Sequence, residues 1–158
     1  MVHVLFRNKR VAVRDIDLSQ ITSLESDPQH RPSAKSKYIP VPDSVFLELL
    51  TSSFNNHETA GSMVAELNCD RVRFVGGLPP GFACYEAPPK DGRHDRYIYG
   101  HHESTRNSFH ADKLFRSFSS FVPHVYWIIC DQVVIGNLPR GCKCFHCVAQ
   151  RTPAPVNA

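Results

Sequence analysis

The chain has 158 residues, of which 42% are hydrophobic and 21% are charged, a composition typical of globular proteins. It contains no run of 18 apolar residues, which excludes a membrane-spanning helix, and its start, MVHVLFRNKR, lacks the apolar stretch of a secretory signal. We therefore expect no membrane partner. We also expect the six cysteines to meet a reducing compartment, where clustered cysteines indicate a metal site more often than disulfides.

Charge is distributed unevenly along the chain. Residues 1–70 contain 7 Lys/Arg and 9 Asp/Glu, a balance of −2, whereas residues 71–158 contain 11 and 6, a balance of +5. A basic half is found in proteins that face a polyanion such as DNA, although a solvated surface is the commoner explanation.

The N-terminal half predicts a hairpin followed by helices. Two short β-rich runs, 2–6 and 10–14, predict a β-hairpin. Residues 26–42 predict a long loop, after which Asp43 is expected to cap a helix. The apolar positions of that helix are Val45, Phe46, Leu49 and Leu50. A second, weaker helix is expected over 58–67.

The C-terminal half predicts two strands, a loop and one apolar helix. The strands are expected at 71–77 and 95–100, and the loop at 100–113. Ser117 is the predicted N-cap of the helix, and Pro123 falls in its first turns, where proline is better tolerated. One face of the helix would carry Phe118, Phe121, Val122 and Val125, with Trp127 in the core. Prolines cluster at 28–42, 79–89 and 153–155 and predict loops or tails there.

Half of the cysteines lie in the heptapeptide GCKCFHC at 141–147. The spacing C-x-C-x-x-C can bring the thiolates of Cys142, Cys144 and Cys147 to one tetrahedral ion, which predicts a structural zinc site. The alternative is a set of free thiols. We also expect Cys69 and Cys84 to be buried thiols that behave as small apolar groups.

A tetrahedral site needs a fourth ligand, and the sequence offers four candidates. His124 is favoured because the apolar helix would present it rigidly, and Cys130 comes second. His146 lies between two of the cysteines, where its ring is poorly placed to turn inward, and Cys84 is more distant. Three thiolates and one imidazole fill the coordination shell, whereas catalytic zinc keeps a position open for water, so we expect no enzyme.

Three motifs resemble the methyl-CpG-binding-domain fold. LPPGF at 78–82 resembles its opening, DRYIY at 95–99 its Asp-x-Tyr-Tyr strand, and FRS at 115–117 its turn into a helix. This resemblance implies an α+β fold: a small methyl-CpG-binding-domain-like sheet and helix at 71–150 with a C-terminal zinc clasp. A β-hairpin and helical part at 1–70 would precede it, and 151–158 would form a disordered tail. Whether 1–70 packs on the rest is left open.

A more specific resemblance is to the transcription-silencing domain of the fungal cryptic loci regulator 2 family. That domain shares the LPPG opening, YIYGH at 97–101, RS at 116–117, PHVYW at 123–127 and the final cysteines at 142–147. The resemblance covers about 78–147. It implies a non-enzymatic nuclear subunit of a fungal heterochromatin complex that couples histone deacetylation to nucleosome remodelling.

The resemblance also raises the question of DNA binding. Reading methylated CpG takes two arginines, and Arg116 matches one of them. Ala83-Cys84-Tyr85 stands where the second would be, so we expect contact with the backbone of duplex DNA rather than methyl-CpG reading. The basic residues expected to make that contact are Arg93, Arg96, Arg106, Lys113 and Arg116.

Other interpretations of single residues and of the whole chain stay beside this one. His101 and His102 are expected to be surface loop histidines. Tyr97 and Tyr99 are expected to share a packed sheet face, with stacking on nucleic acid as the alternative. The alternatives for the chain are a zinc-dependent hydrolase using Asp131 and a protein-interaction scaffold that binds neither DNA nor zinc.

Overall fold

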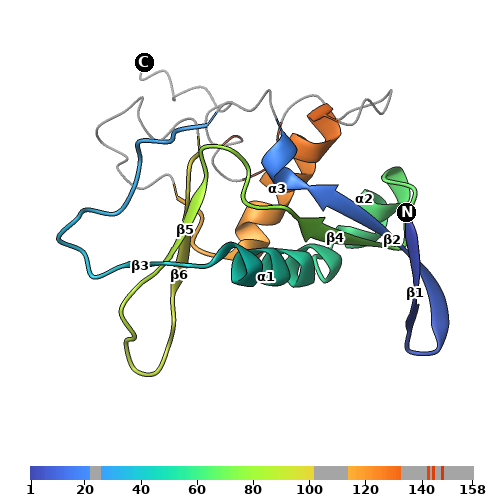
Figure 1. The fold of residues 1–158 in the computed structure, drawn as a ribbon, viewed down its shortest axis with the longest axis horizontal. Helices are drawn as coiled ribbons and strands as arrows, with labels where there is room; N and C mark the ends of the chain where they lie inside the picture. Colours follow the sequence, from blue (N-terminus) through green and yellow to red (C-terminus); the bar gives the residue numbers. More distant parts are fainter. Residues whose placement is uncertain (22–25, 102–113, 133–141, 143, 145–146, 148–158) are drawn as a thin grey trace, which may run out of the picture.

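The computed structural model describes residues 1–21, 26–101, 114–132, 142, 144 and 147. These residues form a small α+β fold with two three-stranded sheets and three α-helices (Figure 1). In chain order the elements are β1 Val2–Phe6, β2 Lys9–Asp17, a 3₁₀ turn Leu18–Gln20, β3 Ile39–Pro40, α1 Asp43–Asn55, α2 Ala60–Glu66, β4 Arg71–Val75, β5 Ala83–Glu86, β6 Arg96–Tyr99 and α3 Phe118–Gln132.

The first sheet has the strand order β1-β2-β4. Strands β1 and β2 form the predicted hairpin, and their two-residue turn places Arg7 and Asn8 at φ of 47° and 62°, as hairpin turns of this length require. Strand β2 continues to Asp17 and pairs in parallel with β4. Parallel strands need a crossover connection, and the segment between β2 and β4 supplies it with α1 and α2.

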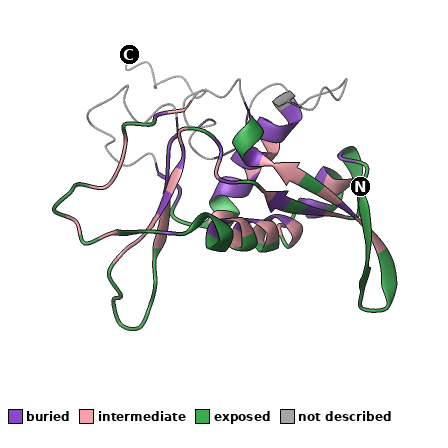
Figure 2. Cartoon of the chain, viewed as in Figure 1, coloured by how far each residue is buried: buried purple, intermediate pink, exposed green. Residues whose placement is uncertain are grey.

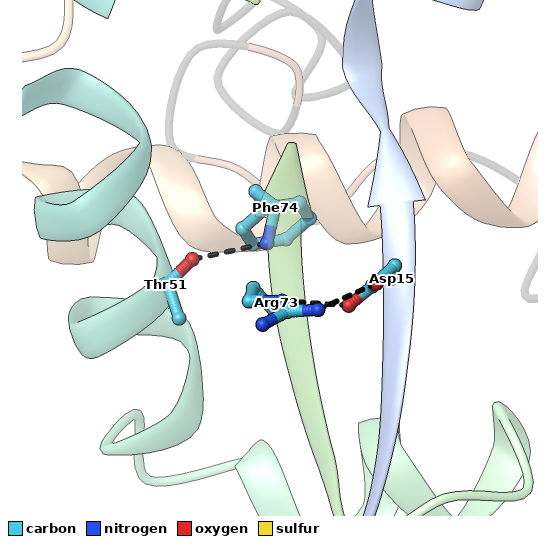
Figure 3. Close-up of polar contacts among 4 residues, drawn as sticks. All are labelled: Asp15, Thr51, Arg73 and Phe74. Atoms are coloured by element: carbon cyan, nitrogen blue, oxygen red, sulfur yellow. Dashed lines mark hydrogen bonds and ion pairs between the residues drawn. The ribbon is translucent and has the colours of Figure 1, made fainter. Parts of the chain in front are cut away.

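Side chains fix the register of β2, β4 and α1 (Figure 3). Arg73 donates to both carboxylate oxygens of Asp15, at 2.8 and 2.7 Å, and these hydrogen bonds lower the pKa of that carboxyl. The backbone N–H of Phe74 donates to Thr51 Oγ1 at 3.0 Å. Because the ion pair is exposed it adds little stability, and its role is to fix the pairing.

Asn55 at the end of α1 also holds this helix against β4 through hydrogen bonds. Its Oδ1 accepts from the backbone N–H of Val72 at 3.0 Å, and its Nδ2 donates to the carbonyls of Val72 and Thr51 at 2.8 and 2.7 Å. Val72 is buried, so water cannot replace these bonds. No pattern in the sequence predicts this role.

Asn55→Ala should therefore lower the free energy of unfolding by about 2–3 kcal/mol, because it leaves both backbone groups of Val72 without their partner. Urea denaturation followed by circular dichroism measures the change. Asn56→Ala is the matched control, since Asn56 is exposed and the contact of its side chain with the Ser52 hydroxyl is long, at 3.5 Å. An equal loss in the two variants would contradict the role given to Asn55.

The second sheet has the order β3-β5-β6, and two of its strands were missed in the sequence. The prolines at 79–89 predicted a loop, but Pro79, Pro80, Pro88 and Pro89 flank β5 rather than interrupt it. The short β3 likewise lies inside the loop expected at 26–42 and pairs with β5. Strand β5 lies between prolines, and β3 includes Pro40 at the edge of the sheet, where proline is tolerated, so the proline clusters did not exclude strands here.

Helix α1 differs in detail from the prediction. Asp43 is the first helical residue rather than the cap; Pro42 occupies the cap position without a side-chain hydrogen bond. In the first turn, the negative charge of the Asp43 carboxylate still interacts favourably with the positive end of the helix dipole. The buried face consists of Phe46, Leu50 and Phe54, four residues apart, while Val45 is exposed (Figure 2).

Helix α3 agrees with the prediction. The Ser117 hydroxyl accepts the backbone N–H of Ser120 at 3.1 Å, which is an N-terminal cap. Phe121, Val122 and Val125 are fully buried, and Pro123 lies inside the helix. Trp127 is partly buried and packs against the core.

One hydrophobic core joins the two halves of the chain. Leu18 and Phe46 from the N-terminal part share it with Ile98 and Phe121 from the C-terminal part. The pairings of β2 with β4 and of β3 with β5 also cross the predicted boundary at residue 70. Residues 1–70 therefore pack on the rest, which the sequence left open.

Candidate metal centre

The three C-terminal cysteines meet two histidines inside the protein. His124 Nδ1 lies 3.3, 3.6 and 3.9 Å from the sulphurs of Cys142, Cys144 and Cys147. His101 Nε2 lies 3.3 Å from the sulphur of Cys147 and 3.9 Å from that of Cys144. All five side chains are buried, and both histidines are 0% exposed.

Helix α3 positions His124 as the sequence predicted. The preceding residue, Pro123, lies in the same helix, and the ring packs among aromatic side chains. The centroid of the His124 ring lies 5.4 to 6.1 Å from the ring centroids of four aromatic residues: Phe82, Phe115, Phe121 and Trp127. A histidine held on every side in this way can present a nitrogen without losing side-chain entropy on binding.

His101 is the site residue that sequence reasoning missed; the expectation of a surface histidine was wrong. It directly follows β6, where Gly100 adopts φ of 121° and Ser26 forms a bridge with His101. Its ring lies 4.9 Å from that of His124 and 5.7 Å from that of Phe115. His102, the other histidine of that expectation, lies outside the described residues.

Strand β6 and helix α3 are tied together beside the site. The backbone N–H groups of Ile98 and Phe115 each donate to the carbonyl of the other at 2.9 Å. Phe115 lies just before the helix cap, so this pair of bonds sets the distance between the strand that carries His101 and the helix that carries His124.

The arrangement fits a tetrahedral metal ion. An ion about 2.3 Å from sulphur and about 2.05 Å from nitrogen separates a sulphur from a nitrogen by about 3.6 Å. The five sulphur–nitrogen distances run from 3.3 to 3.9 Å. The ligand atoms of His101, His124, Cys144 and Cys147 all lie within 4.8 Å of one another. The site can therefore hold a metal ion.

The three thiols of the cluster shift one another's pKa values. Hydrogen bonds from Cys142 and Cys147 lower the pKa of Cys144, while hydrogen bonding to Cys144 raises the pKa of Cys142 to about 12. The pKa of Cys147 is raised as well, first by Cys142 and then by Cys144. A metal ion that binds these sulphurs would displace their protons, so its affinity should rise with pH.

Cys84 and Cys130, the two other candidates that the structure describes, do not join this cluster. Burial raises the pKa of Cys84 to about 12 and also raises that of Cys130, as expected for buried thiols. Cys130 interacts with Tyr126 instead. Cys69 is only partly buried, and His146 lies outside the described residues.

The structure describes three of the five basic residues expected at DNA. Arg93 is exposed at the turn between β5 and β6, next to the exposed Lys90, and Arg116 is exposed just before α3. Arg96 forms an ion pair with Glu86 at 2.7 Å, so it is less available to a phosphate. Arg106 and Lys113 lie outside the described residues.

Residues 74–147 match the family model of the transcription-silencing protein, cryptic loci regulator Clr2. This segment belongs to the Clr2 transcription-silencing family. The match confirms the family expected from the sequence motifs, and the Clr2 segment contains all five residues of the metal centre.

Other comparisons add no relative. No curated protein and no solved structure matches the chain. Within the described residues, none of the helices has the length and apolar character needed to cross a membrane.

Motifs of the Clr2 segment pack around the metal centre. Phe82 of LPPGF is buried, and its ring lies 5.4 Å from Phe121 and 5.9 Å from His124. Gly100 and His101 end the YIYGH strand, and His124 belongs to PHVYW. The motifs by which the family was recognised therefore surround one buried cluster.

Proposed function

We propose that this chain is a non-enzymatic module of transcriptional silencing in the nucleus, folded around a structural zinc ion. It would dock onto other subunits of a chromatin complex with deacetylase and remodelling activities, and it would touch duplex DNA. The observation that carries the proposal is the match of residues 74–147 to the Clr2 family over a segment whose five metal donors are all buried.

Zinc is the ion best suited to these donors. Thiolates and imidazoles in a four-coordinate arrangement are the usual environment of structural zinc, whereas magnesium and calcium prefer oxygen. An ion there would join three parts of the chain: the end of β6, helix α3 and the C-terminal cysteines. Such a clasp stabilises a fold without taking part in chemistry.

The burial of the donors supports a structural rather than a catalytic role. A catalytic zinc needs an open position for water and substrate, usually with a carboxylate nearby. Here both histidines are 0% exposed, and the group of donors contains only imidazoles and thiols. The side chain of Asp131, the acid named for the alternative hydrolase, lies outside the described residues.

The hairpin of β1 and β2 supports docking onto a protein partner. It projects from the body beside α1 (Figure 1), and β1 is an edge strand of its sheet. Val2, Val4, Leu5 and Phe6 are exposed on β1. An exposed apolar edge strand can pair with an extended segment of another protein. Arg7, Lys9 and Arg10 beside it favour an acidic segment.

DNA binding is testable through the exposed arginines. The double variant Arg93→Ala with Arg116→Ala should weaken binding of duplex DNA about tenfold and lower the slope of log affinity against log salt by about 1 to 2, because each lost phosphate contact removes about 0.9. Gel-shift titrations at two salt concentrations measure both quantities. Asp91 and Asp95 lie on the same turn as Arg93, so the wild-type affinity should be modest.

Lys9→Ala is the control for this experiment, because Lys9 is an exposed cation on the other hairpin. It should leave both affinity and salt slope unchanged. Absence of any shift by the wild-type protein at low salt would remove DNA from the proposal and leave docking onto protein subunits as the function.

A further inference from the structure

The metal centre contains one donor more than a tetrahedral ion takes. Two sets of four are compared here, and His124, Cys144 and Cys147 belong to both of them. The fourth position can be taken by Cys142, as the sequence favoured, or by His101. The two choices give different chemistry, since one set has three thiolates and the other has two.

Distances place His101 inside the coordination shell. Its Nε2 approaches two sulphurs at 3.3 and 3.9 Å, and His124 Nδ1 approaches the same two at 3.9 and 3.6 Å. These four separations average close to the value of about 3.6 Å calculated for zinc. The four ligand atoms lie within 4.8 Å of one another, so one ion can reach all four of them.

The backbone holds His101 in place before any ion arrives. The carbonyl of Gly100 accepts the N–H of Asp27 at 2.9 Å, and Ser26 bridges His101 itself. The imidazole is 0% exposed and packs against Phe115. A fixed imidazole aimed at two sulphurs costs little further ordering when it binds.

Charge favours the set that contains His101. Two thiolates and two neutral imidazoles cancel the charge of a divalent ion, so this set needs no compensating cation in the core. Three thiolates and one imidazole leave one negative charge among buried residues, and burying an uncompensated charge is expensive.

Cys142 lies against the backbone beside the site. Its sulphur lies 3.9 Å from the carbonyl oxygen of Pro123 in α3. The same sulphur accepts the backbone N–H of Cys144 at 3.3 Å, so it can brace the ligand next to it.

From these observations we infer that the ion is held by His101, His124, Cys144 and Cys147, with Cys142 beside it as a supporting residue. This assignment rests on the proposed metal site and adds its ligand set. Cys142 is then a positioning residue for the turn that carries Cys144.

X-ray absorption at the zinc edge of the intact purified protein tests the assignment. The expected first shell has two sulphurs and two nitrogens. A shell of three sulphurs and one nitrogen overturns the ligand set and leaves the metal site standing. A protein without bound metal overturns the proposed structural zinc itself, so the two failures are distinguishable.

Matched variants give a second readout through competition with a chromophoric chelator. Cys142→Ala should keep about one equivalent of zinc and the same absorption shell, with an affinity about tenfold below wild type because a supporting group beside the ligands is lost. His101→Ala should lose more than 100-fold in affinity. If His101→Ala does not fold, the first coordination shell of zinc in Cys142→Ala tests the ligand set instead. Fewer sulphurs in that shell than in wild type, or loss of the ion, overturns the inference.

Discussion

Cys144→Ser should abolish metal binding and remove most of the stability of the fold. The Cys144 sulphur approaches both histidines, at 3.6 and 3.9 Å, and belongs both to the ligand set with His101 and to the ligand set with Cys142. Structural zinc contributes about 10–16 kcal/mol in small metal-dependent folds, so losing one thiolate should cost at least about 3 kcal/mol here. The melting temperature should fall by about 10 °C or more, with lower solubility.

Cys69→Ser is the matched control for that variant. Cys69 is only partly buried and stands apart from the cluster, so its replacement should cost less than about 1 kcal/mol. Thermal melts followed by circular dichroism, with metal content measured on the same samples, compare the two. Equal effects of the two substitutions would contradict the role of Cys144 as a ligand.

Gly100→Ala should be the most damaging substitution outside the cluster. An added Cβ would lie 2.6 Å from the Gly81 carbonyl oxygen and 2.8 Å from Phe82 Cα, both backbone atoms that cannot turn aside. The φ of 121° is also one that L-residues rarely adopt. Strain and overpacking together should cost about 3–5 kcal/mol. Metal affinity should fall as well, because the next residue is His101.

Gly92→Ala separates the effect of the positive φ from the effect of the steric clash. Gly92 also has a positive φ, 72°, but a Cβ there would meet no atom within 4 Å. It should lose only about 1 kcal/mol, the cost of a left-handed conformation without a clash. Urea titrations of the two variants measure the difference, and similar losses would show that the contact between Gly81 and Gly100 does not matter.

The part of the site that follows local rules could be predicted from the sequence. Three cysteines at C-x-C-x-x-C spacing fall close together in any compact conformation, so the cluster needed no tertiary information. His124 was accessible because the pattern of apolar residues and Ser117 fixed the helix that carries it. The hairpin was predictable for the same reason, since its strands are adjacent in the chain.

His101 could not be predicted by any spacing rule. It lies 46 residues before Cys147 and reaches the cluster only because the chain turns at Gly100 and pairs with Ser26. From the sequence it is one of two adjacent histidines at the start of a polar stretch, which is typical of a surface loop. Its burial depends on long-range packing, which no local pattern reports.

In the fold, too, features that depend on long-range contacts could not be predicted from local sequence patterns. Asn55 is an exposed-looking polar residue at the end of a helix, yet it bonds to the backbone of a strand 17 residues away. Strand β5 was hidden by its flanking prolines, although its pairing with β6 is local. A proline restricts only the backbone near its own position. Whether β5 forms depends on its pairing with β3 on one edge and with β6 on the other.

The metal cluster lies where three separate parts of the chain meet. One ion would link the end of β6, helix α3 and the C-terminal cysteines into a single unit within the segment that matches the Clr2 family. The hairpins beside α1 would then be presented on a rigid body, as docking onto a partner requires.

Metal analysis of the wild-type protein, purified without added zinc, tests this account most directly. Inductively coupled plasma mass spectrometry should find about one equivalent of zinc, and removing it with a strong chelator should abolish the cooperative thermal transition. A protein that contains no metal and still unfolds cooperatively at the same temperature would contradict the account.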